Sequence, residues 1–272
     1  MRGSAGLGVA AAVLVLIIAA AAASLWWTPF PVDGFDMGNR FAMPTAAHPL
    51  GTDHYGRDVV SMLMVGAQTS LAVAAGAVAI GLFVGTPLGL AAASSGRAGR
   101  AVLMLGSDIV FAFPALIVAA ILSTFRGPGA FNALIAIGIF YIPVFMRLTA
   151  SSARRVLALD FVDAARLAGK SSARIAAEHV LPVVAPILLT QAATQFAIAI
   201  LIEAGLSYVG LGAQPPAVSW GRMLAEAQTL ISLAPQLAVW PGLAIVVTVL
   251  AATALGEGLN RRLDPRFAGR HA

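Results

Sequence analysis

The sequence predicts an all-α integral membrane protein with six transmembrane helices. Hydrophobic residues make up 59% of the chain and charged residues 11%, and the mean hydropathy is +0.88. A water-soluble domain of 272 residues could not cover that much apolar side chain, so we expect lipid to be the solvent. Six stretches are also long enough to cross a hydrocarbon core, which takes about 20 apolar residues per helix.

The six predicted spans alternate with more polar segments. They cover residues 7–27, 69–93, 101–123, 131–148, 181–206 and 236–259. The chain is therefore divided into an N-terminal transmembrane helix (1–27), an external segment (28–68), a core of five transmembrane helices (69–259) with a helical pair at 160–180, and a tail (260–272). With the N-terminus inside, 13 of the 17 Lys and Arg residues lie inside and 4 outside, which favours both termini in the cytoplasm.

The first span has some features of a cleavable signal peptide, namely Arg2, an apolar run and small residues at 21–24. Its apolar run is longer than a usual signal core, and Trp26 and Trp27 are typical interfacial anchors. We therefore expect a retained helix. The net charge of +5 follows from the positive-inside bias, so no nucleic acid partner is expected, and without cysteine the chain has no disulfide or thiolate metal site.

Small residues and prolines mark the interior of the spans. Gly81, Gly85 and Gly89 recur every four residues, which gives a helix a flat groove where another backbone can approach closely. Four prolines remove a backbone donor and can bend a span: Pro87, Pro114, Pro143 and Pro186.

The external segment is rich in turn-forming residues. His48, Asp53, His54 and Asp58 are metal-ligating types, but their spacing fits no standard ligand template. We expect turn and capping roles instead, with Thr52 or Asp53 opening a short helix that leads to the membrane, and no metal site.

The fifth span is unusually polar. Thr190, Gln191, Thr194 and Gln195 share one helical face, which predicts either the lining of a hydrated substrate path or hydrogen-bonded packing between helices. Glu203, near the outer end of this span, is grouped with the path because an acid in lipid must be paired or hydrated. The same cost applies to Asp108 in the third span, for which we expect an interior hydrogen bond.

The outer loop from Gly205 to Pro235 contains closely spaced glycines and a Pro-Pro pair, which favour irregular backbone. Irregular backbone at membrane depth must be buried in protein or face a wet cavity. The loop is therefore a candidate external gate or contact surface, with these residues as candidates: Ser207, Tyr208, Gln214 and Trp220.

The polar stretch from residue 160 to 182 predicts a helix, a turn and a second helix. Asp160 fits an N-cap with Asp163 three positions later, Gly169 permits the positive backbone angle that ends a helix, and Ser171 or Ser172 can cap the next. Pro182 suits the first turn of the following span. Alternatively, Asp163 acts only in capping, and an apolar patch formed by Phe161, Val162 and Ala165 lies on the membrane surface. The sequence Gly-Lys-Ser at 169–171 is no phosphate-binding loop, because residue 164 is alanine and no strand precedes it.

These residues resemble a known family. Asp163-Ala164-Ala165, Gly169 and Leu181-Pro182 are similar to the EAA signature of ABC-importer permeases, although Asp163 is one methylene shorter than the usual glutamate and His179 takes the place of an aliphatic residue. Five further blocks resemble the C-type permease subunit of dipeptide and oligopeptide importers: HPLGTDHYGRDVV, DIVFAFPALIV, EAGLSYVGLGAQPPAVSWGRML, PGLAIVVTVL and GLNRRLDPR.

The resemblance implies a type I importer (MetI-like) permease fold in a bacterial cytoplasmic membrane. The implied partners are a homologous B-type permease, two ATPase subunits that bind ATP and Mg, an external substrate-binding lipoprotein and a peptide substrate. The chain itself would have no enzymatic activity and no cofactor. It would couple to the ATPases through these residues: Asp160, Asp163, Ala164, Ala165, Gly169, Leu181 and Pro182.

Three alternatives stay open at this point. Sister importers of nickel chelates, glutathione or haem share these motifs. A stand-alone secondary transporter predicts inverted repeats or paired buried acids, which the sequence lacks. An intramembrane enzyme requires a serine beside a base, but none of the four histidines lies in a span, and Ser207 lacks the second glycine of a nucleophile elbow.

Overall fold

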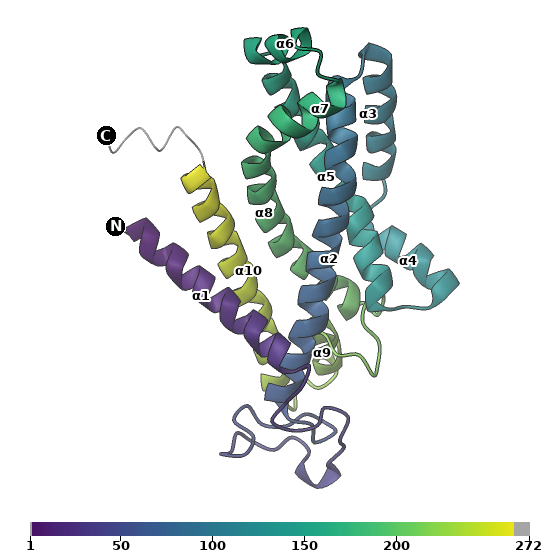
Figure 1. The fold of residues 1–272 in the computed structure, drawn as a ribbon. Coiled ribbons are helices and arrows are strands. Elements are labelled where there is room, and N and C mark those ends of the chain that lie inside the picture. The colour runs from purple at the N-terminus through teal and green to yellow at the C-terminus, as the bar shows by residue number, and fades with distance from the viewer. Residues whose placement is uncertain (1, 264–272) are drawn as a thin grey trace.

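The structure is a computed structural model that describes residues 2–263, and every named element in that part of the chain is helical. Five helices are long and apolar enough to cross a membrane: α1 (Arg2–Ala23), α2 (Val59–Ser94), α5 (Ala130–Leu157), α8 (Leu181–Tyr208) and α10 (Gln236–Leu263). Figure 1 shows them as one bundle of long, tilted rods. The predicted all-α membrane fold is confirmed.

The third predicted span, 101–123, is not one helix. It consists of α3 (Arg97–Phe111) and α4 (Ala115–Arg126), which are bent by 75° relative to each other. The break falls at Pro114, which lacks a backbone donor and disfavours helical backbone in the residue before it. The other three predicted prolines lie inside α2, α5 and α8 without ending them. The six predicted spans are therefore five long helices and one broken pair.

Short elements occupy the two ends of the bundle (Figure 1). One end carries residues 28–58, with a 3₁₀ turn η1 (Met37–Asn39), and α9 (Trp220–Gln228). The other end carries α6 (Asp160–Leu167), α7 (Ser172–Ile175) and a π-helical turn η2 (Ala176–Val180). The start of α1 packs on the far end of α10, where the side chain of Leu7 lies against Gly258.

Several predicted boundaries shift. α2 begins at Val59 rather than at 69, and its cap is Asp58, which accepts a hydrogen bond from the Ser61 amide (2.8 Å). Neither Thr52 nor Asp53 opens a helix, so that prediction was wrong. α5 continues to Leu157, nine residues beyond the predicted end at 148, and the predicted irregular outer loop contains α9. The predicted tail overlaps the end of α10 up to residue 263, and the rest of it lies outside the described residues.

The glycine groove on α2 is a close contact between two helix backbones. A Cβ added at Gly85 would lie 2.5 Å from the carbonyl oxygen of Ile142, and one at Gly89 would lie 2.5 Å from that of Met146. A Cβ added at Gly81 would lie 2.5 Å from the Cβ of Tyr141. Because residue numbers rise together on both helices, α2 and α5 run parallel. The predicted packing role of the glycine spacing is confirmed.

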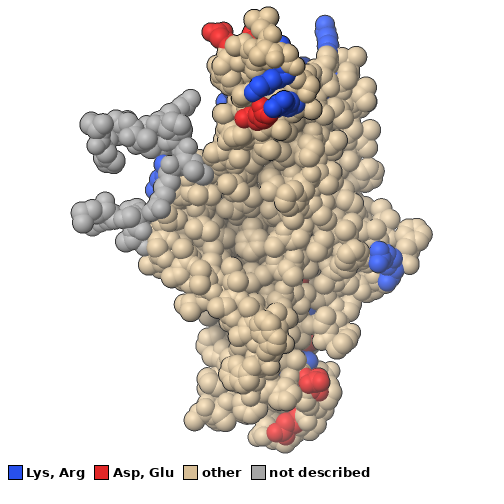
Figure 2. All heavy atoms as spheres, viewed as in Figure 1, with Lys and Arg blue, Asp and Glu red and all other residues tan. Residues whose placement is uncertain are grey.

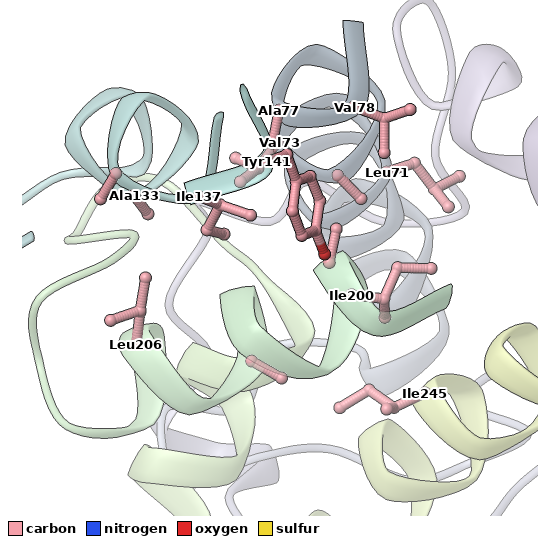
Figure 3. Close-up of a cluster of buried hydrophobic side chains, with 14 of the residues drawn as sticks. Leu71, Val73, Ala77, Val78, Ala133, Ile137, Tyr141, Ile200, Leu206 and Ile245 are labelled. Atoms are coloured by element: carbon pink, nitrogen blue, oxygen red, sulfur yellow. The ribbon is translucent and has the colours of Figure 1, made fainter. Parts of the chain in front are cut away.

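Tyr141 connects this helix pair to α8. Its side chain is fully buried, and its hydroxyl donates to the backbone oxygen of Gln195 on α8 (2.9 Å). Figure 3 shows the Tyr141 ring among Val73 and Ala77 of α2, with the hydroxyl directed at the α8 ribbon and Ile200 nearby. A buried hydroxyl must find such a partner, so this bond fixes the position of α8 against α5.

Charged side chains are unevenly distributed over the surface. On the face shown in Figure 2 they gather around α6 and α7 at one end and around the external segment at the other, with one basic group over α4. The middle of that face carries almost none. An uncharged belt between two charged ends is the surface that a bilayer requires.

We predict that Gly85→Ala destabilises the protein, because its methyl group would overlap a backbone carbonyl that cannot rotate away. The expected loss is about 1–3 kcal/mol of unfolding free energy. It is measured as a lower thermal transition in detergent. Gly242→Ala on α10 is the control, since nothing lies within 4 Å of its added Cβ. Equal stability of the two variants would contradict close packing of α2 on α5.

Candidate coupling site and outer gate

The predicted helix-turn-helix at 160–182 is present, with one error at its start. α6 begins after Leu159, which makes no side-chain cap bond, and Asp160 is the first helical residue rather than the N-cap. Asp163 forms an exposed ion pair with Arg166 (2.8 Å). The predicted capping box is therefore wrong, although both acids still lie in the first turn, where the helix dipole favours negative charge.

The turn and the second helix are as predicted. Gly169 adopts a φ of +80°, and the hydroxyl of Ser171 accepts a hydrogen bond from the Arg174 amide (3.3 Å). Lys170 and Arg174 both donate to Glu178 in the π turn, at 2.7 and 2.6 Å. These bonds fasten the turn between the helices to the segment that leads into α8.

α6 is attached by one side and presents the other to solvent. Val162 and Ala165 are buried, whereas Ala164 and Asp163 are exposed. Leu167 at the end of α6 is 91% exposed. Leu159 and Phe161 are exposed as well, so apolar side chains lie on the surface of this polar, charged end of the bundle. We call the surface formed by residues 159–170 the platform.

The platform continues into α8 without an intervening loop. α7, η2 and α8 follow one another directly, and the connecting residues have helical backbone angles. Leu181 and Pro182 lie partly exposed in the first turn of α8, where Pro182 needs no helical hydrogen bond. α7, η2 and α8 therefore form one continuous helical segment.

The polar face of α8 makes intramolecular contacts. Thr190 donates to the Pro186 carbonyl (3.1 Å) and Thr194 to the Thr190 carbonyl (3.3 Å), both within their own helix. Thr194 also lies next to Gly256 of α10. Gln195 is buried, and Gln191 is half-buried. These contacts favour packing for the two threonines, and the path role of this face stays a prediction.

An apolar cavity of about 380 Å³, open to the surface of the chain, lies between α2 and α8. Its wall comes from Leu82, Phe83, Thr86, Pro87, Leu90, Leu181, Ala185, Leu188 and Leu189. Among the residues that the structure describes, this wall contains none of the five predicted path residues. The cavity and the polar face of α8 are therefore two separate features.

The four predicted gate residues differ in their accessibility. Trp220 is buried, and its indole donates to the Leu63 carbonyl of α2 (3.0 Å). Ser207 is fully buried and donates to Glu203 (2.7 Å). Gln214 closes its own turn by donating to the Gly210 carbonyl (2.9 Å), and Tyr208 is 41% exposed. Of the four, Ser207 and Trp220 are engaged within the chain rather than displayed on its surface.

Asp108 does not make the interior hydrogen bond that was predicted. It forms an ion pair with Arg147 of α5, and its side chain is 62% exposed. Arg147 also donates to Ser107 (3.0 Å) and lies over the ring of Phe111. The pair forms because α3 packs on α5, a contact between segments that the sequence did not reveal.

The external segment is fastened to α9 by an ion-pair network that the sequence did not predict. Arg57 contacts Asp53 (2.6 Å) and Glu226 (3.1 Å), and Arg222 also bonds to Glu226 (3.0 Å). The pairs Asp53–Arg57 and Arg222–Glu226 each have a four-residue spacing, but nothing local in the sequence links Arg57 to Glu226.

The metal-ligating residue types of this segment have turn and capping roles. Asp53 accepts hydrogen bonds from the amides of Tyr55 and Arg57, and Asp58 caps α2 while contacting His48 (3.0 Å). The backbone carbonyl of His54 accepts a hydrogen bond from the Arg40 side chain (2.7 Å). The expected turn chemistry is present at Asp53, whereas the helix cap is Asp58 and not Thr52 or Asp53. In the nearby turn, the side chain of Asn39 donates to Asp36 and lowers the pKa of that carboxyl below its ordinary value.

Comparison with known proteins gives a consistent result. Residues 85–269 match the family model described as binding-protein-dependent transport system inner membrane component. A dipeptide transport system permease of Alkalihalophilus pseudofirmus is 40% identical over 84% of this chain and 75% of its own length. A di/tripeptide transport system permease of Pseudomonas aeruginosa is 42% identical over 80% of this chain and 72% of its own length. A glutathione transport system permease of Escherichia coli is 38% identical over 90% of this chain and 81% of its own length.

A solved structure shares the fold. A chain of the MetNI methionine ABC transporter in an inward-facing conformation superposes with a TM-score of 0.63, covering 75% of this chain and 96% of its own. The two sequences are only 17% identical, so this similarity supports the fold alone.

We predict that Gln191→Cys reacts with a water-soluble maleimide in at least one conformational state. The chain has no native cysteine, so a single replacement reports one position. Leu189→Cys is the control, because Leu189 is 53% exposed on the apolar side of the same helix. Protection of Gln191→Cys in every state would assign this face of α8 to helix packing.

Proposed function

The chain belongs to the family of binding-protein-dependent transport system inner membrane components, and on that basis we propose that it is the C-type permease subunit of an importer of dipeptides and oligopeptides. Two relatives at 40% and 42% identity, named as dipeptide and di/tripeptide permeases, support the peptide cargo. The observation that carries the coupling part of the proposal is the exposed platform that continues directly into α8.

The proposed assembly contains a homologous B-type permease, two ATPase subunits and an external substrate-binding lipoprotein. ATP and Mg bind to the ATPase subunits and not to this chain. Closure of the ATPases on ATP moves the platform, and α8 carries this motion to the outer end of the bundle. The permease halves then open outward, accept the peptide from the binding protein and release it to the cytoplasm after hydrolysis.

The proposed location is a bacterial cytoplasmic membrane with both termini in the cytoplasm. The positive-inside distribution of the 17 basic residues supports this orientation. The packing of the start of α1 against the end of α10 agrees with it, since both chain ends then lie on one side. The external segment and α9 face the binding protein in this orientation.

Glutathione is the second candidate cargo. A relative named as a glutathione permease is 38% identical over 90% of this chain, a coverage greater than that of the two peptide permeases. Glutathione is itself a modified tripeptide, so a path that fits small peptides also fits it. Selection between these cargoes rests largely with the binding protein in the proposed assembly.

We predict that Asp163→Arg abolishes most transport but leaves the fold intact. Asp163 is exposed and pairs only with Arg166 on the same helix, a contact worth about 0–1 kcal/mol. Reversal of its charge on a surface that meets a partner should lower peptide uptake at least about tenfold. Uptake into vesicles and membrane insertion are measured in parallel.

The matched control is Glu257→Arg, because Glu257 is also exposed and pairs with a basic residue one turn away on its own helix, Arg261 (3.5 Å). We expect this variant to retain uptake. Normal uptake by Asp163→Arg would contradict a coupling role for the platform.

The cargo is tested with the whole importer in proteoliposomes that contain ATP. We predict ATP-dependent accumulation of a labelled dipeptide, which an excess of unlabelled di- and tripeptides reduces in proportion to their affinity for the binding protein. Accumulation of glutathione alone, without competition by dipeptides, would replace the peptide assignment with the second candidate.

A further inference from the structure

The outer end of α8 contains a buried acid that coupling and transport, as described above, do not use. Glu203 is fully buried, although it was grouped with the path on sequence grounds. Its Oε1 accepts a hydrogen bond from the Ser207 hydroxyl (2.7 Å), and the hydroxyls of Ser70 and Ser219 lie near the same carboxyl. Burial of a carboxyl is costly, so retention of this group needs a specific reason.

The hydrogen bond to Glu203 fixes the direction in which the Ser207 hydroxyl points. A serine hydroxyl has one proton, and here that proton is directed to Glu203. The oxygen is then free to accept, and it accepts a hydrogen bond from the Ala213 amide (3.0 Å). Gly212 passes so close that an added Cβ would overlap the Ser207 hydroxyl. The turn after α8 is thereby held against the end of that helix.

The chain leads from this turn directly into α9, which is packed with similar closeness. A Cβ added at Gly221 would lie 2.5 Å from the backbone of Ala204 on α8. The Trp220 amide donates to Ser70 of α2 (3.2 Å), and the Trp220 indole donates to the Leu63 carbonyl (3.0 Å). Ser219, which caps α9, is fully buried. α2, α8 and α9 therefore meet around Glu203.

We propose that Glu203 is a positioning residue for the outer gate. By accepting from Ser207 it orients that hydroxyl toward Ala213, and so it keeps the turn at 209–213 and the start of α9 closed on α2 and α8. The residue acts through Ser207 and does not contact the cargo. This inference rests on the proposed transport function, because a gate has meaning only if a substrate passes.

Three variants separate the hydrogen bond from the charge. Glu203→Gln keeps an acceptor oxygen for Ser207 without the charge, Glu203→Leu removes the acceptor at similar volume, and Ser207→Ala removes the hydroxyl. Ser123→Ala is the control, since Ser123 bonds only to a carbonyl of its own helix, that of Ala119 (2.8 Å). The reporter is Val218→Cys, a buried position between the turn and α9.

Labelling of the reporter by a membrane-impermeant thiol reagent is measured in the reconstituted whole importer without substrate. We expect Glu203→Leu and Ser207→Ala to raise the labelling rate about tenfold, as loss of one buried hydrogen bond predicts. Glu203→Gln and Ser123→Ala should label at the rate of the unmodified background. If Glu203→Leu does not fold, Ser207→Ala alone decides the result.

Two results would overturn the proposal. Labelling at the background rate in folded Ser207→Ala would show that the turn is held by other contacts. Fast labelling of Glu203→Gln would assign the effect to the charge rather than to the acceptor. Because labelling needs no cargo, absence of peptide uptake by the unmodified importer would refute only the proposed function.

Discussion

The close approach of α2 and α5 is the constraint on which the rest of the structure depends. Glycines at three successive turns of α2 allow the backbone of α5 to lie where a side chain would otherwise be. Two consecutive long helices that pack in parallel need a connection that returns across the bundle, and the bent pair α3–α4 provides it. The same contact orients Tyr141, whose hydroxyl holds α8.

The two ends of the bundle are built on different physical principles. Ion pairs at the platform end are exposed, so they contribute little stability and exchange readily for contacts with a partner. The outer end is held by buried hydrogen bonds around Glu203 and Trp220, which are costly to break singly. α8 joins the two ends without interruption. One helix thus joins an end with exposed ion pairs to an end with buried hydrogen bonds, which fits the proposed transmission of motion from the platform to the outer end.

Local sequence signals predicted much of the local structure, although the caps expected at Asp160 and at Thr52 or Asp53 are absent. Glycine spacing predicted the groove on α2, Gly169 the positive backbone angle, and Ser171 the cap of α7. Four prolines gave the same signal, yet only Pro114 coincides with a break. Pro87 and Pro143 lie in helices held by the glycine contact, whereas the exposed apolar residues on both sides of Pro114 indicate weaker support. Contacts between distant segments, such as Arg57 with Glu226 and Asp108 with Arg147, depend on how the helices pack. No periodic pattern in the sequence indicates them.

The central claim is that this chain works as one half of an ATP-driven permease, and purification from the native membrane through an affinity tag tests it most directly. The subunits that travel with the chain are identified, and the ATPase activity of the complex is measured with and without peptide-loaded binding protein. The predicted result is a second permease and an ATPase pair whose hydrolysis rises with the loaded binding protein. A stable chain without partners that transports peptide in the absence of ATP would contradict the claim.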